Sequence, residues 1–173
     1  MNADQLRTLQ APLKEKYREH PEAASITLRA SSRLGEGVTC NVETGRALVE
    51  AGLHPATGGT GLSACSGDML LEALAACAGV TLNAVATALG IALRSARVLV
   101  EGDLDFRGTL GVSKETAVGF QVIRVRFELD TDAPADQVET LLRLTERYCV
   151  VYQTLAGGTQ IGVTHAVGAG PAA

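Results

Sequence analysis

The sequence lacks several features, and each absence argues against a class of function. It has no Trp and only 3 Tyr and 3 Phe among 173 residues, which are too few aromatic side chains for a base-stacking surface. Its formal net charge is -4, so it has no basic field to attract nucleic acid. We therefore expect no nucleic-acid partner. A 46% share of hydrophobic residues is typical of a globular protein with a packed core.

The sequence also predicts neither a membrane span nor a leader peptide. Residues 73–93 approach the length that a membrane helix needs, but Gly79, Asn83 and Gly90 favour a buried core helix. Residues 1–17 are charged and lack the apolar segment of a signal peptide. We expect a cytoplasmic protein with no membrane partner.

Cysteine and histidine are sparse, and their spacing indicates no metal centre. The four cysteines are Cys40, Cys65, Cys77 and Cys149. None forms a Cys-x-x-Cys motif, and in a reducing cytosol they do not indicate a disulfide scaffold. The three histidines share no zinc-ligand spacing with them; they are His20, His54 and His165. We expect no metal or other cofactor.

Helical periodicity predicts three helices, over 3–19, 68–89 and 134–148. Asp68 or Ser66 is expected to cap the second helix, and Gly90 to end it. Its apolar residues run almost all the way round, which indicates a helix covered on every side by a sheet or by a second subunit. Pro134 suits the start of the third helix, whose apolar stripe ends at Cys149.

Alternation and turn signals predict strands between these helices, and they group in antiparallel sets. The predicted strands are 26–30, 38–42, 91–107, 119–129 and 160–167. The fold class is therefore α+β rather than doubly wound α/β. We expect an N-terminal helical extension over 1–22, a single domain over 23–168 and a loose tail over 169–173. The long loop 52–67 is a candidate functional segment.

Cys77 and Cys149 are the main candidates for chemistry, although each has a structural alternative. Cys77 lies within the apolar helix among small residues, and a free cysteine there can be a packed core residue. Cys149 lies on the inward face at the end of a helix, where packing alone could also explain it. A redox function requires the two thiols to lie within disulfide reach in the fold.

Three segments resemble the OsmC/Ohr family, the osmotically inducible and organic-hydroperoxide-resistance proteins. They are Ala-Ala-Cys at 75–77, Gly-Asp-Leu-Asp-Phe-Arg-Gly at 102–108, and Glu-Arg-Tyr-Cys-x-x-x-x-Thr-Leu at 146–155. The resemblance covers roughly residues 25–165. It implies an OsmC-like fold, with antiparallel sheets wrapped around central helices in an intertwined homodimer.

The resemblance also implies a cysteine-based peroxide reductase that uses neither metal nor haem. Cys77 would be the peroxidatic thiol, and Cys149 would resolve its sulfenic acid as a disulfide. The substrates would be organic hydroperoxides and, less well, hydrogen peroxide. An external dithiol would reduce the disulfide, supplied by a lipoyl protein, a thioredoxin or a small thiol.

In this family an Arg after the first strand, held by an acidic residue, activates the thiol. Arg33 and Asp68 are the residues that match these two roles. Arg29 and Arg46 compete with Arg33, which could equally be a solvated surface residue, and Asp68 could be a plain helix cap. The segment 64–68 lacks the usual Asn-Pro, and Val150 stands where a Pro often follows the second cysteine. These departures indicate a divergent branch.

The remaining cysteines and His54 have both structural and functional interpretations. Cys65 is expected to be a bystander, with an alternative role as a redox partner, and Cys40 is expected to be structural. His54 fits a surface loop better than a proton donor near the site. The alternative to a peroxidase is a non-catalytic protein on the same scaffold, binding a small apolar ligand or acting as a stress-associated dimer.

Overall fold

An antiparallel sheet forms the larger part of the fold. The computed structural model describes residues 3–34, 40–42, 51–62 and 64–165. Within these residues four strands form one sheet in the order β2-β1-β5-β6. They are β1 (Ser25–Leu34), β2 (Cys40–Val42), β5 (Ser95–Asp105) and β6 (Phe120–Asp130). A short parallel pair joins β3 (Ala51–Gly52) to β4 (Ala64–Cys65), just before the long helix.

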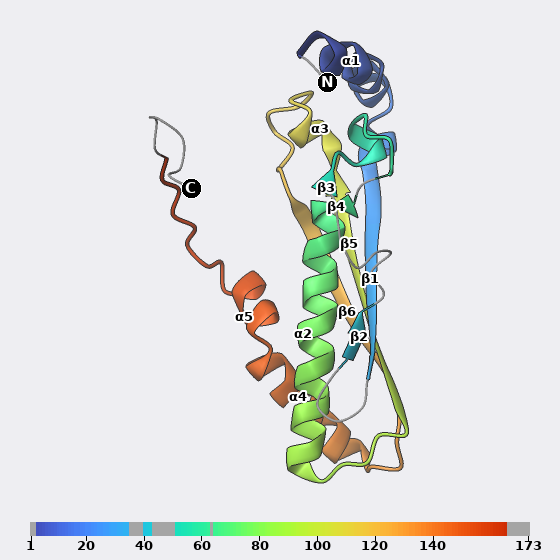
Figure 1. Cartoon of the computed structure of the whole chain (residues 1–173), viewed down its shortest axis with the longest axis vertical. Helices are drawn as coiled ribbons and strands as arrows, with labels where there is room; N and C mark the ends of the chain where they lie inside the picture. Colours follow the sequence, from blue (N-terminus) through green and yellow to red (C-terminus); the bar gives the residue numbers. More distant parts are fainter. Residues whose placement is uncertain (1–2, 35–39, 43–50, 63, 166–173) are drawn as a thin grey trace, which may run out of the picture.

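The helices lie against the sheet and at its ends, so the α+β class is confirmed. The α-helices are α1 (Ala3–Glu19), α2 (Ser66–Leu89), α3 (Phe106–Thr109), α4 (Ala135–Tyr148) and α5 (Val150–Ala156). Two 3-10 turns are η1 (Pro21–Ala24) and η2 (Pro55–Thr57). Figure 1 shows α2 running along the sheet, with α1 near one end of the molecule. α4 and α5 also pack against α2.

The core lies between α2 and the inner face of the sheet. Alternation along β5 turns Ala96, Val98 and Val100 inward, and all three are buried. Leu71, Leu74 and Leu82 of α2 meet them at helical spacing. Partly buried side chains of β6 pack on the same cluster; these are Ile123, Val125, Phe127 and Leu129. Each fully buried leucine contributes roughly 2–3 kcal/mol of transfer free energy.

α2 is only partly covered within the single chain. Leu70 and Val80 remain 37% exposed, and Met69 is also exposed. The rest of one chain therefore covers only part of the helix, and cover of the exposed part by a second subunit stays a prediction. By length and composition alone α2 could cross a membrane, but 44% of its most apolar stretch is buried inside the fold, as in a core helix.

The end of the chain differs from the sequence prediction. A separate helix, α5, follows Cys149, because extended backbone at that residue (φ -72, ψ 107) interrupts the helical path. The strand predicted over 160–167 is absent from residues 160–165, and residues 166–167 lie outside the described part. Ile161 and Val163 are 87% and 89% exposed, and none of the strands in the described part of the chain pairs with this segment. Figure 1 shows it leading away from the sheet.

Other element boundaries in the structure differ from the predicted ones by a few residues. α2 begins at Ser66, and its N-cap residue is Cys65, which makes no side-chain cap bond. The predicted cap at Asp68 or Ser66 is therefore wrong. Gly90 ends the helix in the left-handed conformation (φ 67), as predicted. The short helix α3 follows β5, at the end of the strand that was predicted over 91–107.

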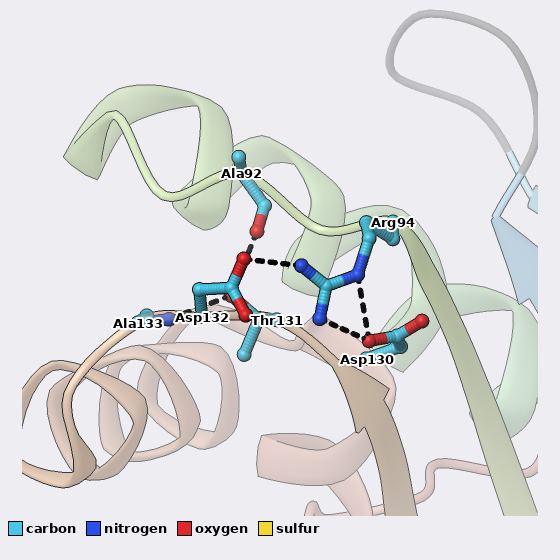
Figure 2. A network of polar contacts seen from close by, with 6 residues as sticks. All are labelled: Ala92, Arg94, Asp130, Thr131, Asp132 and Ala133. Carbon is cyan, nitrogen blue, oxygen red and sulfur yellow. Dashed lines mark hydrogen bonds and ion pairs between the residues drawn. The ribbon is translucent and has the colours of Figure 1, made fainter.

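A polar network fixes the turn into α4 (Figure 2). Arg94, between α2 and β5, donates hydrogen bonds to Asp130 at 2.8 and 2.5 Å and forms an ion pair with Asp132. The Thr131 hydroxyl donates to the carbonyl of Ala92 at 2.7 Å and accepts from the N–H of Ala133 at 3.1 Å. These bonds join the start of β5 to the end of β6, and so they set where α4 and its terminal Cys149 lie.

Candidate functional site

Cys77 lies in the middle of α2 and is half-buried. Ala78 and Gly79, which follow it, are buried against the rest of the fold. Small side chains at these positions let another segment approach the helix closely. The segment that does so is the turn between α4 and α5.

Cys149 occupies that turn and is 1% exposed. It ends α4 and begins α5, and its sulfur accepts a hydrogen bond from the N–H of Tyr152 at 3.5 Å. Leu141 and Thr145, at helical spacing before it, are also buried. The predicted apolar stripe therefore brings Cys149 to the inward face of α4.

The two thiols lie within hydrogen-bonding distance of each other. The structure describes both as free thiols, 72 positions apart in the sequence. The sequence predicted this pair, and the geometry fulfils the condition that a redox function requires of it.

The surroundings shift the pKa values of the two thiols in opposite directions. Burial by itself raises the pKa of Cys77, but hydrogen bonds from the Val151 N–H, Cys149, the Thr81 hydroxyl and the Val150 N–H lower it more. Its net pKa is below that of an ordinary thiol. Burial and the neighbouring Cys77 together raise the pKa of Cys149 to about 11, although the N–H groups of Tyr152 and Val151 lower it in part. Cys77 is thus the thiol that ionises first.

Asp68 lies at the beginning of α2, away from the thiols. It precedes Cys77 by nine residues, which corresponds to about 13 Å along a helix. Burial raises the pKa of Asp68, and the neighbouring His54 lowers it. Its titratable neighbours are His54 and Glu72, so the structure does not bring Asp68 to Cys77 within this chain.

Arg33 lies in a strand rather than in a loop after the first strand, where the family resemblance predicts it. The first strand extends to Leu34, and its register pairs Arg33 with Arg97 of β5 and with Asn41 of β2. The strand is longer than predicted because both of its edges are paired. The side chain of Arg33 lies outside the described part, as does Arg46, so the role of Arg33 stays a prediction.

Cys65 and His54 lie apart from the thiol pair. Cys65 precedes Cys77 by 12 residues, about 18 Å along the helix, which is beyond disulfide reach in one chain. His54 caps η2: its Nδ1 accepts the Ala56 N–H at 3.0 Å, and its ring stacks on Phe106 at 5.2 Å. His54 therefore has a structural role as a cap, and Cys65 lies at the start of α2, away from the thiol pair. Cys40 lies in β2, and its side chain is not among the described ones.

A groove of about 440 Å³ opens beside Cys149. It lies between β6 and the helices α4 and α5, and most of its walls are apolar. Its lining includes Ile123, Val125, Phe127, Leu142, Glu146 and Tyr152. The groove offers apolar surface for a small organic group next to Cys149. In the described part of the chain, no three His, Cys, Asp or Glu side chains gather as metal ligands.

The donors that surround Cys77 could be found only in part from the sequence. Thr81 lies one helical turn after Cys77, a spacing that places both on one face and could have indicated the contact. The N–H groups of Val150 and Val151 carry no such signal, since any residue except proline supplies one.

The fold and the site together define a class: an α+β protein in which a central-helix cysteine meets a second cysteine from an inter-helix turn. The family model described as OsmC-like protein matches residues 59–164, so the chain belongs to the OsmC-like family. The match includes both Cys77 and Cys149 and confirms the resemblance seen in the sequence.

A solved structure supports the fold. It is the crystal structure of an OsmC-like hydroperoxide resistance protein from Jannaschia sp. CCS1, with a TM-score of 0.56 and 14% sequence identity. The similarity covers 86% of this chain and 97% of that one. At this identity the likeness shows the fold alone. No match was found among curated proteins.

Proposed function

We propose that this protein is a thiol-dependent peroxidase that reduces organic hydroperoxides. The observation that carries the proposal is the contact between Cys77 and Cys149, together with the opposite shifts of their pKa values. The OsmC-like family and the peroxide-related name of the Jannaschia protein agree with it.

In the first step the Cys77 thiolate attacks the terminal oxygen of the hydroperoxide. An S–O bond forms and the O–O bond breaks, so the sulfur loses two electrons and the peroxide gains them. The departing alkoxide takes up a proton and leaves as an alcohol. The lowered pKa of Cys77 favours this step because the thiolate is the reacting form.

In the second step Cys149 attacks the sulfenic acid on Cys77. An S–S bond forms, the S–O bond breaks, and the hydroxide leaves as water with the proton of the Cys149 thiol. The contact between the two sulfurs lets this step occur without large movement of the chain. An external dithiol then exchanges with the disulfide, returns both thiols and becomes oxidised itself.

The groove beside Cys149 supports the organic class of substrate. Its apolar walls can hold the hydrocarbon part of a hydroperoxide, which hydrogen peroxide does not have. The same surface supports the second candidate, a protein that binds a small apolar ligand without turnover.

A mass measurement separates the two candidates. Reduced protein is mixed with an equimolar amount of cumene hydroperoxide, and its intact mass and peptide map are recorded over minutes. We expect the loss of two hydrogens, with the disulfide mapped to Cys77 and Cys149. An unchanged thiol content would contradict the peroxidase and favour the binding protein.

Matched variants test the roles of the cysteines. Cys77→Ser is expected to abolish peroxide consumption, and Cys149→Ser to stop the reaction at a sulfenic acid that dimedone traps. Cys65→Ser is the control and should react like the unmodified chain, since Cys65 lies too far from Cys77 to take part. Peroxide consumption by Cys77→Ser would contradict the assignment.

A further inference from the structure

The groove beside Cys149 has the size and the lining of a small-molecule site. Its volume of about 440 Å³ lies within the range of roughly 300–1,000 Å³ that such sites occupy. Its hydrocarbon walls come from β6, α4 and α2 and consist of Ile123, Val125, Phe127, Leu142 and Ala78. A molecule that enters the groove therefore places apolar surface against these walls and next to Cys149.

The groove also contains a single charged side chain. Among the described residues of its lining, Glu146 is the only acidic or basic one, so no Lys or Arg of the lining neutralises it. Thr145 and Tyr152 carry neutral hydroxyls, and that of Thr145 already donates to the carbonyl of Leu141 at 2.8 Å. A molecule in the groove thus meets apolar walls and one carboxylate.

The corner between α4 and α5 holds Glu146 beside the groove. Glu146 lies in the last turn of α4, three positions before Cys149. Its carbonyl accepts a hydrogen bond from the side-chain amide of Gln153 at 2.9 Å, and this bond ties α5 to α4. The residue is exposed, so its carboxylate stays hydrated while the groove is empty.

We propose that Glu146 is a specificity-determining residue, which makes the groove select neutral organic hydroperoxides over those that carry a carboxylate or another anionic group. This inference rests on the proposed function, because it names the charge of the substrate in that reaction. An anion that enters the groove gives up water against apolar walls and meets a like charge, whereas the hydrocarbon part of a neutral molecule encounters neither effect. Because Glu146 is exposed, solvent screens the repulsion, and the selectivity should be about fivefold to tenfold.

Two fluorescent dyes test this selectivity without any peroxide. N-phenyl-1-naphthylamine is neutral, and 8-anilinonaphthalene-1-sulfonate has the same ring system with an added sulfonate. Fluorescence titration gives the dissociation constant of each dye, and cumyl alcohol, the product expected from cumene hydroperoxide, is added as a competitor. We expect the neutral dye to bind at least about fivefold more tightly than the sulfonate, and cumyl alcohol to displace it.

Variants of two glutamates on α4 assign the effect. In Glu146→Gln the dissociation constant of the sulfonate dye should fall about fivefold, and in Glu146→Lys it should fall further, while that of the neutral dye stays within about twofold. Glu139→Gln and Glu139→Lys are the matched controls, because Glu139 is exposed on the same helix two turns earlier and does not line the groove. Both constants should stay unchanged in these controls.

Three results overturn the proposal. The first is an unchanged affinity for the sulfonate dye in both Glu146 variants, and the second is an equal change in the Glu139 variants. The third is a neutral dye that does not bind or that cumyl alcohol does not displace, because the groove would then not take up neutral molecules.

A pair of substrates separates this proposal from that of the function. Cumene hydroperoxide and its para-carboxylate differ by one anionic group, and their consumption is followed with dithiothreitol as the reductant. If neither is consumed while the dyes show the expected selectivity, the peroxidase is rejected and the groove stands as a site for neutral ligands. If both are consumed at equal rates and the Glu146 variants leave dye binding unchanged, the peroxidase stands and the role of Glu146 is rejected.

Discussion

At the scale of single residues, the two cysteines differ because their partners differ. Cys77 accepts hydrogen bonds from several donors that favour its charged form, whereas Cys149 is almost fully buried and next to a second sulfur. Because of this difference, each thiol performs a different step of the proposed reaction. The first attacks the peroxide as an anion, and the second keeps its proton until a sulfenic acid is present.

The asymmetry predicts selective modification of the reduced protein. Between pH 7 and 8 we expect iodoacetamide to label Cys77 at least about tenfold faster than Cys149, because only the thiolate reacts. Labelling of Cys149 should rise only as the pH approaches 11, where its pKa lies. Peptide mass spectrometry at timed intervals measures both rates. Equal rates for the two residues at pH 7.5 would contradict the assignment of roles.

The sequence identified the sulfurs but not all of their surroundings. Cys77 and Cys149 could be found because each lies on an apolar helical face, and helical spacing predicts which way a side chain points. Arg33 and Asp68 were chosen by their place in the chain. Nine residues of helix separate Asp68 from Cys77, and the helix predicted over 68–89 already implied that separation.

At the scale of elements, the turn between α4 and α5 determines the site. Cys149 adopts an extended conformation there, so the chain leaves α4 and starts α5 with new N–H groups directed at the sulfurs. The N–H groups of Val150 and Val151 reach Cys77, and that of Tyr152 reaches Cys149. One turn therefore supplies both the second thiol and part of the stabilisation of the first.

Replacing Val150 by proline tests this turn. Proline removes one N–H donor to Cys77, while the first position of a helix and the extended Cys149 before it both accept proline. Val150 is 71% exposed, so the ring has room. We expect a higher pKa for Cys77, with alkylation at pH 7 slowed about threefold to tenfold, and an unchanged Tm.

Val150→Ala is the control for this variant, since it shortens the side chain and keeps the N–H. Its alkylation profile should match that of the unmodified protein. If the proline variant also matches, the Val150 N–H contributes nothing to the thiolate and the turn acts through Val151 alone.

The turn η2 carries a second titratable group, His54. Burial lowers the pKa of His54, and Asp68 raises it in part. The unfolded state therefore binds a proton more readily than the folded one, and the free energy of unfolding should fall as the pH drops below about 6.5. Protonation also removes the acceptor of the Ala56 N–H. We expect Tm to decline by a few degrees between pH 7 and 5.

His54→Asn isolates this effect because asparagine can accept the same cap bond but does not titrate. The variant should show a flatter dependence of Tm on pH, and His20→Asn, at an exposed site, should behave like the unmodified chain. A decline in Tm that is as steep in His54→Asn would assign it to other groups.

The sequence predicted most elements, and its errors have physical causes. Periodicity located α1, α2, α4 and the long strands β5 and β6, since each has one face against the core. It could not distinguish α5 from a continuing loop, because seven residues carry too little periodicity. The strand predicted near Ile161 had the right alternation, but a strand also needs a neighbour to pair with.

At the scale of the whole molecule, the single chain leaves apolar surface uncovered. Met69, Leu70 and Val80 of α2 are exposed, and so are Ile161 and Val163 near the end of the described chain. Proteins that act alone rarely leave a central helix in this state. We propose that a second copy of the chain covers α2, in agreement with the homodimer that the sequence resemblance implies.

The last prediction tests this homodimer. In sedimentation velocity at micromolar concentration, the protein should have twice the mass of one chain. Val80→Glu places a carboxylate on the exposed side of α2, where a second subunit would have to bury it at a cost of several kcal/mol, and should shift the mass toward one chain. Val118→Glu makes the same change at an exposed valine in the loop before β6 and should leave the mass doubled. A single-chain mass for the unmodified protein, or a doubled mass for Val80→Glu, would show that α2 is not the interface, and the exposed face would then need another explanation.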